Sequence, residues 1–337
     1  MRTNDHNPGD KTNGATPPTA PPQNAGPVFL VGALRSGTTM LRLMLDGHPD
    51  LRVPFEFDFA VDAIGEDGRY PSVPAYLEHL ATHRIFLATG LQSDPELSYR
   101  ELVNSYLEQA RVKAGKPRVG ATLHRHFEYL PQLWPNARYL HLLRDGRDVA
   151  RSVIRMGWAG NAYVAANVWL EAERSWDRLC TQVPADRRME VRYEALVREP
   201  EQMLREVCAF LEITYDPDML EYHKRSTYGR PTPKAAANWQ KDAATRKEGL
   251  LAEAKLRTML QMRGYPLSSE GPDAPIAPHR DLLLRADSRL KAFAFRAKRM
   301  GPQLTAMDMV TRRFPVPKQF RQAVQRQINA VELQHLK

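Results

Sequence analysis

Short apolar runs alternate with longer stretches of helical periodicity over the first two thirds of the chain. Three runs predict short buried strands: 27–32, 138–143 and 189–193. Apolar residues recur at helical spacing over six further segments: 38–47, 75–88, 98–114, 145–156, 161–178 and 201–211. Strands that alternate with helices predict an α/β fold with three layers, in which helices flank a central parallel β-sheet.

The two ends of the chain depart from this pattern. Residues 1–26 are polar and rich in proline, which predicts a disordered N-terminal segment. Prolines cluster again in residues 266–280, where we expect a linker. The remaining residues, 281–337, are predicted to form a basic, mainly helical C-terminal extension. The main folded domain is therefore expected to span residues 27–265.

The net charge of +9 is confined to the C-terminal part of the chain. Residues 280–337 contain 13 Lys or Arg and 4 Asp or Glu, whereas the rest of the chain contains 35 of each kind. Because the main domain is neutral overall, we do not expect it to bind nucleic acid. Leucines and phenylalanines among the basic residues leave three interpretations of the extension: a helix packed on the domain, an amphipathic helix on an anionic membrane, or a homodimer contact.

Hydropathy and cysteine content bear on the compartment. The sequence contains no apolar run of the roughly 18 residues that a transmembrane helix needs. Its first 26 residues lack the apolar core of a signal peptide, so we expect a cytoplasmic protein, either free or peripheral at the inner membrane face. Cys180 and Cys208 are too few for a disulfide framework and are expected to pack as small apolar residues.

The segment Gly32–Thr39 has the spacing of a Walker A phosphate-binding loop, except that Thr38 stands in place of the lysine. Glycines let the backbone approach a phosphate, and the following helix presents its N-terminus to the anion. Arg35 can supply the missing cation. The alternative is that the glycines only shape a strand-to-helix turn. The residues expected to bind phosphate are Arg35, Ser36, Gly37, Thr38 and Thr39.

Residues 35–50 resemble the 5′-phosphosulfate loop of sulfotransferases that use 3′-phosphoadenosine 5′-phosphosulfate (PAPS), most closely the tyrosylprotein-type and related bacterial enzymes. Residues 142–152 resemble the 3′-phosphate site of that family. The resemblance implies that Arg144 and Ser152 share one phosphate, although Arg144 could instead form an ion pair with Asp145 or Asp148.

Two weaker matches concern the nucleotide. Tyr193 opens a segment that resembles the family's Tyr-Glu-Asp-Leu motif, although Ala195 replaces its aspartate. The resemblance implies that Tyr193 helps to hold the nucleotide; the alternative is a tyrosine of the core. The family also closes a loop bearing lysine and tryptophan over the nucleotide, and residues 234–241, including Trp239, are the candidates for it.

The resemblance implies a sulfotransferase that moves the sulfuryl group of PAPS to a hydroxyl of a small-molecule, glycan or lipid acceptor, with no metal. Glu56 lies 21 residues after Arg35, where the resembled branch carries its catalytic glutamate, and its apolar neighbours are expected to raise its pKa. Arg35 is expected to stabilise the charge that develops on the leaving phosphate. His48 is a weaker catalytic candidate, since a packing role explains it equally well.

Two departures from the family's pattern limit this interpretation. A lysine that assists transfer in the family is absent from residues 120–126, so either Arg35 suffices or His124 or Arg125 replaces it. Asp58 stands where the tyrosylprotein type carries an arginine, so we do not expect sulfation of acidic tyrosine peptides. The acceptor pocket is expected to form from residues 58–117 and 157–170.

Two other functions are compatible with a phosphate-binding loop. A P-loop kinase would bind ATP with magnesium, but the Walker A lysine is missing and we find no strand that ends in a Walker B-like aspartate. A non-catalytic nucleotide-binding module with a basic docking tail is the second alternative.

Overall fold

A computed structural model of the chain describes residues 26–230, 232, 238–271 and 276–334. Its centre is a parallel sheet of five strands in the order β2-β3-β1-β4-β5. The strands are β1 (Val28–Val31), β2 (Leu51–Arg52), β3 (Arg118–Leu123), β4 (Arg138–Leu143) and β5 (Arg188–Arg192). The predicted α/β class, the parallel sheet and the three predicted strands are confirmed.

Strands β2 and β3 were not predicted from the sequence. β2 has only two residues, and β3 begins with a charged residue and contains Gly120 and Thr122. β3 is nevertheless an inner strand, because residues 120–123 pair with β1 while Arg118 and Val119 pair with β2. Pairing on both sides, rather than local hydrophobicity, makes this segment a strand.

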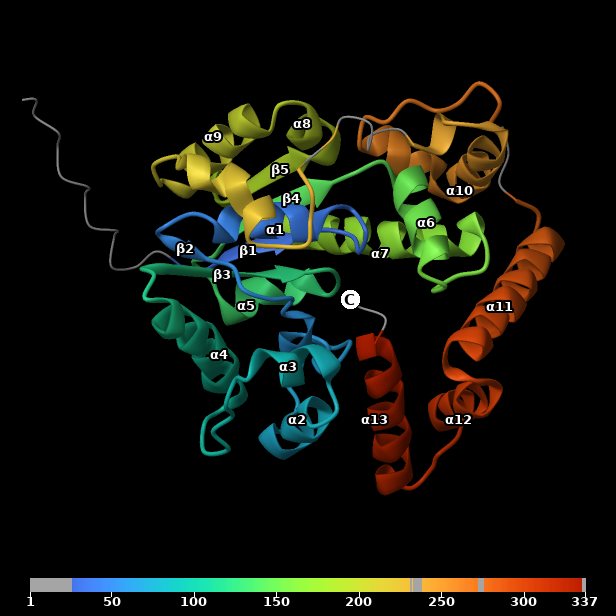
Figure 1. The fold of residues 1–337 in the computed structure, drawn as a ribbon, viewed down its shortest axis with the longest axis horizontal. Helices are drawn as coiled ribbons and strands as arrows, with labels where there is room; N and C mark the ends of the chain where they lie inside the picture. The colour runs from blue at the N-terminus through green and yellow to red at the C-terminus, as the bar shows by residue number, and fades with distance from the viewer. Residues whose placement is uncertain (1–25, 231, 233–237, 272–275, 335–337) are drawn as a thin grey trace, which may run out of the picture.

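Helices cover both faces of the sheet (Figure 1). Alternate residues of β1 point to opposite faces: Phe29 and Val31 belong to one apolar core, and Leu30 to the other. The first face is covered by α4 (Tyr99–Ala114), α6 (Gly146–Arg155), α7 (Ala162–Cys180) and α10 (Ala243–Met262). The second is covered by α1 (Thr38–Asp46), α8 (Tyr193–Arg198) and α9 (Pro200–Leu211). The prediction of three layers is thus confirmed.

The predicted helix over residues 75–88 is wrong in one respect. The segment forms two helices, α2 (Val73–Leu80) and α3 (Arg84–Thr89), with His83 extended between them. The His83 ring accepts a hydrogen bond from the Phe86 amide at 3.3 Å, which caps α3 and fixes the break. A short helix, α5 (Leu130–Leu133), follows β3. Cys208 is buried and Cys180 half-buried, both as free thiols within helices.

The C-terminal extension is helical, as predicted, and consists of α11 (Pro278–Met300), α12 (Pro302–Arg313) and α13 (Lys318–Gln334). It lies along one side of the molecule (Figure 1). The Gly160 amide donates to Ser288 Oγ at 2.9 Å, and Asn329 Nδ2 donates to the Thr82 carbonyl at 3.0 Å. The extension therefore contacts the domain both at the start of α7 and at the α2–α3 junction. Among the described residues, no helix is long and apolar enough to cross a bilayer. Of the segment predicted to be disordered, residues 1–26, all but Gly26 lie outside the described residues.

Candidate active site

The turn from β1 into α1 is built around two glycines that have close neighbours. A Cβ atom at Gly32 would lie 2.6 Å from the Leu142 carbonyl oxygen, and one at Gly37 would lie 2.6 Å from the Tyr193 ring. Gly37 has a φ of +104°, which residues with a side chain rarely adopt. Arg35, between them, has a φ of +74° and must be held there by its surroundings. Local geometry of this kind is typical of a loop that surrounds a ligand with its backbone.

The first turn of α1 offers backbone N–H groups to an anion. The residue before the helix is Gly37, which has no side chain to accept their hydrogen bonds. The Ser36 hydroxyl is buried and donates to the Ala33 carbonyl at 2.7 Å, so it stabilises the turn. This loop therefore combines helix-terminal amides that no side chain caps with a fixed backbone, which is the chemistry of a phosphate site.

The loop lies against both other segments that the sequence singled out. Arg35 Nε donates to Ser152 Oγ at 3.1 Å, although 117 residues separate them. Arg144 Nη1 donates to the Arg35 carbonyl at 3.4 Å, and its guanidinium lies over the Tyr193 ring, 4.1 Å from the centroid. The alternative ion pair of Arg144 with Asp148 is present only at 4.0 Å. The structure thus brings together Arg35, Arg144, Ser152 and Tyr193.

A buried chain of polar contacts joins the loop to the end of β3. His124 Nε2 lies 3.0 Å from Thr38 Oγ1, and His124 Nδ1 lies 2.9 Å from Asp58 Oδ2. The main-chain N–H of His124 donates to Asp58 Oδ1 at 2.7 Å. The side chains of His124 and Asp58 are almost fully buried. This arrangement follows from the sheet order, because β1 and β3 are neighbours and both end at this edge.

Electrostatics favours an ion pair between these two side chains. Burial by itself lowers the pKa of His124, but the charge of Asp58 and the hydrogen bond to it raise that pKa above its ordinary value. Burial likewise raises the pKa of Asp58, and His124 more than reverses this and lowers it. A protonated His124 donates through Nε2 to Thr38, and so places a positive charge beside the first residue of α1.

Glu56 lies next to this pair. It bridges to Thr122 of β3, and the Phe57 amide donates to the Thr122 carbonyl at 2.7 Å. The carboxylates of Glu56 and Asp58 and a ring nitrogen of His124 lie within 4.8 Å of one another. Glu56 is half-buried, whereas the other two are buried. The structure therefore assembles two carboxylates and one imidazole beside the phosphate loop.

The model of a sulfotransferase family matches residues 27–217, which is more than half of the chain. The chain belongs to the sulfotransferase family. A protein-tyrosine sulfotransferase of Drosophila melanogaster is 26% identical over 278 residues, which cover 73% of this chain and 53% of that protein. Human protein-tyrosine sulfotransferase 1 is 29% identical over 212 residues, covering 58% of this chain and 54% of that protein. The chain thus spans about half the length of these two relatives.

One solved structure shows the same fold. The sulfotransferase domain of the Synechococcus PCC 7002 olefin synthase superposes with a TM-score of 0.51 at 22% sequence identity. The superposition covers 73% of this chain and 98% of that domain. At this identity the comparison concerns the fold alone, and it confirms a sulfotransferase-type arrangement of sheet and helices.

Within this sulfotransferase-family chain, two other candidate residues have structural roles. Both ring nitrogens of His48 are engaged: Nε2 lies 2.7 Å from the Thr214 carbonyl, and Nδ1 accepts the Asp50 amide at 3.0 Å. Arg125 forms a bidentate ion pair with Asp62, at 2.7 and 2.6 Å. Both contacts explain these side chains without a part in catalysis.

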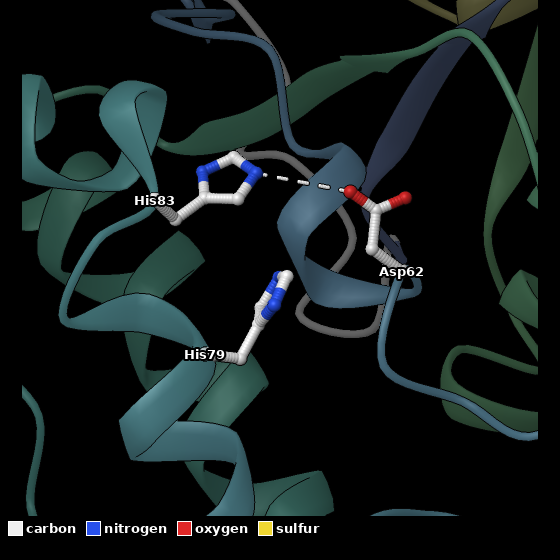
Figure 2. Close-up of side chains that lie close together, drawn as sticks. All are labelled: Asp62, His79 and His83. Atoms are coloured by element: carbon white, nitrogen blue, oxygen red, sulfur yellow. Dashed lines mark ion pairs between the residues drawn. The ribbon is translucent and has the colours of Figure 1, made fainter. Parts of the chain in front are cut away.

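Within the described part of the chain, two groups of side chains bring potential metal ligands together, which local sequence spacing did not reveal. One is Glu56, Asp58 and His124; the other is Asp62, His79 and His83 (Figure 2). In the second group, His83 Nε2 is 3.7 Å from Asp62, whose two oxygens already bind Arg125. His83 Nδ1 accepts the hydrogen bond of the Phe86 amide that caps α3. In the neutral ring the proton is then on Nε2, so this nitrogen has no lone pair to offer a metal. Hydrogen bonds and ion pairs account for Asp62 and His83, whereas the buried Nε2 of His79 has no hydrogen-bond partner among the described residues. The absence of a metal stays a prediction.

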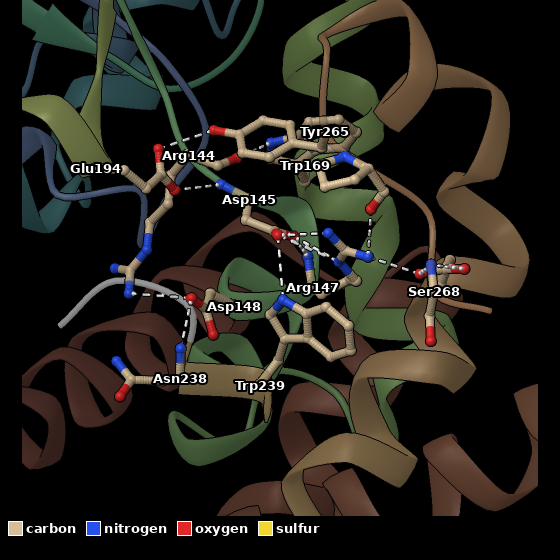
Figure 3. A network of polar contacts seen from close by, with 12 residues as sticks. Arg144, Asp145, Arg147, Asp148, Trp169, Glu194, Asn238, Trp239, Tyr265 and Ser268 are labelled. Atoms are coloured by element: carbon tan, nitrogen blue, oxygen red, sulfur yellow. Dashed lines mark hydrogen bonds and ion pairs between the residues drawn. The ribbon is translucent and has the colours of Figure 1, made fainter. Parts of the chain in front are cut away.

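Trp239 lies in a buried network rather than at the loop (Figure 3). Its indole N–H donates to Asp145 Oδ2 at 3.2 Å, and the Arg147 guanidinium lies 4.0 Å from its ring centroid. Arg147 in turn binds Asp145 and, at 2.6 Å, Glu253 of α10. Trp239 therefore anchors its segment to α6 and α10, and its described contacts include no residue of the phosphate loop. Lys234, from the same predicted closing loop, lies outside the described residues.

Asp58 is the site residue that sequence reasoning misjudged. The sequence indicated only the loss of an arginine at this position, whereas the structure shows the buried partner of His124. A usable signal existed, because the sequence lacks a basic residue of the family's pattern both at Asp58 and within residues 120–126. Only their proximity shows that the two replacements belong together.

Proposed function

We propose that the chain transfers the sulfuryl group of PAPS to a hydroxyl group of an acceptor (EC 2.8.2.-). The observation that supports this most directly is the contact between Arg35 and Ser152 at 3.1 Å. It places the two segments with anion-binding chemistry side by side, as a donor with phosphates at both its 5′ and 3′ positions requires. An ATP-dependent kinase has no use for a second phosphate site of this kind.

Each of these groups has a distinct task in donor binding. The backbone amides at the start of α1, with Thr38 and Thr39, bind the 5′-phosphate. Arg144 and Ser152 bind the 3′-phosphate, where a guanidinium offers paired donors. Tyr193 holds Arg144 by stacking against it. Since the Arg35 side chain reaches Ser152, its guanidinium lies between the two proposed phosphate positions. It can therefore bind either phosphate.

The reaction is an in-line displacement at sulfur. A bond forms between the acceptor oxygen and sulfur, the bond from sulfur to the 5′-phosphate oxygen breaks, and 3′-phosphoadenosine 5′-phosphate (PAP) leaves. Negative charge develops on the leaving phosphate, so fixed cations beside the loop lower the barrier. Arg35 and protonated His124 supply them, and His124 thereby takes the place of the family's lysine.

Glu56 accepts the proton of the acceptor hydroxyl in this proposal. It lies beside Asp58 and His124, at the edge of the sheet where β1 and β3 end. Asp58 is a poor alternative, because both of its oxygens bind His124. A general base must reach the proton that it removes, and a half-buried carboxylate is accessible to an acceptor.

The acceptor is proposed to be a hydroxyl of a small molecule, a glycan or a lipid. Residues 58–117 and 157–170 are expected to form its pocket. The C-terminal extension contacts both regions, the first at Thr82 and the second at Gly160. The relatives are named for protein tyrosine, but Asp58 is committed to His124 in this chain. That position therefore offers no positively charged side chain to bind an acidic peptide. Acidic tyrosine peptides are not expected as acceptors.

Thermal unfolding in the presence of PAP, compared with ATP and magnesium, tests donor binding. Stabilisation by PAP and turnover of labelled PAPS with an acceptor panel are expected. Glu56→Gln should abolish turnover and leave PAP binding intact, while Glu171→Gln, on the exposed surface of α7, should change neither. Stabilisation by ATP and magnesium alone would contradict the proposal in favour of a kinase. PAP binding without turnover of any acceptor would leave a nucleotide-binding module.

A further inference from the structure

Helix α11 carries an exposed apolar surface on the side away from the domain. Leu282, Leu283 and Leu290 are 68%, 66% and 71% exposed, and Phe293 is 39% exposed. Residues 282, 286, 290 and 293 follow the spacing of one helical face. We call these four residues and Leu283 the α11 stripe.

The opposite face of α11 is the one that packs on the domain. The Leu284 carbonyl accepts from Asn161 Nδ2 at 2.7 Å, and Ser288 Oγ accepts from the Gly160 amide at 2.9 Å. The Phe295 ring lies so close to Gly157 that a Cβ atom there would clash with it. Each docked residue is two positions from a residue of the α11 stripe, which corresponds to about 200° around a helix. The stripe is therefore directed outward by the docking of α11, and Figure 1 shows α11 at the rim of the molecule.

Basic residues border the α11 stripe. Between Pro278 and Met300 there are seven Lys or Arg and two Asp. Both aspartates form ion pairs along the helix, Asp281 with Arg285 at 2.7 Å and Asp287 with Lys291 at 2.9 Å. Arg289 lies on one border of the stripe and Lys298 on the other, since they are 60° and 120° from Ala286 around the helix. An apolar face bordered by cations matches the interface of a bilayer that contains anionic lipids.

We propose that α11 binds the surface of an anionic membrane through the α11 stripe, with the domain attached to its opposite face. A second copy of the chain is the less favourable occupant. A two-fold interface would place this patch against itself, and the basic residues that border the stripe, Arg289 and Lys298, would then lie near their own copies without an acidic partner from the stripe. Anionic headgroups neutralise these charges, whereas a second copy repeats them. This proposal does not depend on the reaction that the domain catalyses.

Co-sedimentation of the full chain with vesicles tests the proposal. Vesicles of phosphatidylcholine and phosphatidylglycerol in equal parts are expected to bind the chain, and vesicles of phosphatidylcholine alone to bind it much more weakly. Binding to the mixed vesicles should fall as salt is added, because counterions screen the attraction. Failure of the full chain to bind the mixed vesicles at low salt overturns the proposal.

Variants separate the stripe from the net charge. Leu290→Glu should lower the affinity for mixed vesicles at least about tenfold. It replaces a leucine that would insert into the bilayer by a carboxylate, which anionic headgroups repel. Val112→Glu is the matched control, because Val112 is 62% exposed but lies on α4. It should bind like the unchanged chain. Equal unfolding temperatures for the two variants exclude misfolding.

The oligomeric state of the chain tests whether a second copy, rather than a membrane, covers the α11 stripe. Analytical ultracentrifugation without vesicles is expected to show the same species for the unchanged chain and for Leu290→Glu. If Leu290→Glu instead converts a dimer into monomers and leaves vesicle binding unchanged, the stripe is a dimer interface and the proposal is wrong.

Discussion

Asp58 binds His124 with both of its carboxylate oxygens, one on the main-chain N–H at 2.7 Å and the other beside ring Nδ1 at 2.9 Å. The first contact fixes the position of the backbone at the end of β3, and the second fixes the orientation and charge of the ring. His124 Nε2 is thereby directed to Thr38 at the start of α1. The pair is neutral overall, but it directs the N–H of a protonated imidazole at the loop and keeps the negative charge on the Asp58 side of the ring.

Asp58→Asn should lower the pKa of His124, because it removes the charge that holds the ring protonated. We expect turnover to fall about 10- to 100-fold at neutral pH, with a smaller effect on PAP affinity. Asp58 acts as a positioning residue, so the decisive readout is the pH profile. Its alkaline limb should move to lower pH in the variant. An unchanged limb with reduced turnover would mean that Asp58 only supports the fold.

The shifted pKa values of His124 and Asp58 predict how activity and stability depend on pH. The pKa of His124 is raised in the folded chain. Its contribution to the free energy of unfolding is therefore complete below the ordinary pKa of 6.5 and is lost as pH rises through the raised pKa. Asp58, whose pKa is lowered, contributes above its ordinary pKa and loses this contribution as pH falls through the lowered value.

His124→Lys and His124→Gln test the charge directly. The lysine variant should keep activity to a higher pH than the unchanged chain, because lysine deprotonates at a higher pH. The glutamine variant, which can still contact Thr38, should lose activity at every pH. Rates from pH 6 to 10 with labelled PAPS measure both. Equal activity of the glutamine variant would show that Arg35 alone suffices.

Gly37→Ala should disrupt the phosphate loop. The added Cβ would meet the Tyr193 ring at 2.6 Å in a backbone conformation that alanine rarely adopts, at a cost of about 1–3 kcal/mol in the free energy of unfolding. PAP binding should be lost with it. Gly115→Ala is the control, because Gly115 has a φ of +64° but no atom near the added Cβ. It should cost about 1 kcal/mol and leave PAP binding unchanged.

Arg147→Met should destabilise the chain strongly. Arg147 is buried between Asp145 and Glu253, and the substitution leaves two buried carboxylates without their cation. We expect a loss of about 3–5 kcal/mol in the free energy of unfolding by urea. Arg111→Met, which breaks an exposed pair with Glu108 on α4, should cost less than about 1 kcal/mol. A loss for Arg147→Met as small as that of the control would mean that the network in Figure 3 adds little to stability.

The sequence by itself determined the elements whose signal is local. Strand β1, the glycine loop and α1 follow from an apolar run, two glycines and helical spacing within twenty residues. The second signature around Arg144 was equally visible. Together these segments indicated the fold class and the phosphate chemistry, because backbone conformation and anion binding at a helix start depend on near neighbours.

Tertiary structure decided what depends on contacts between distant segments. β3 is a strand because β1 and β2 pair with it, and Asp58 acquires a role because it is buried against His124, 66 residues away. Trp239 is drawn into a core network, and α11 exposes leucines because its other face docks at Gly160. Burial and pairing set these outcomes, and they exist only once the sheet brings the strand ends together.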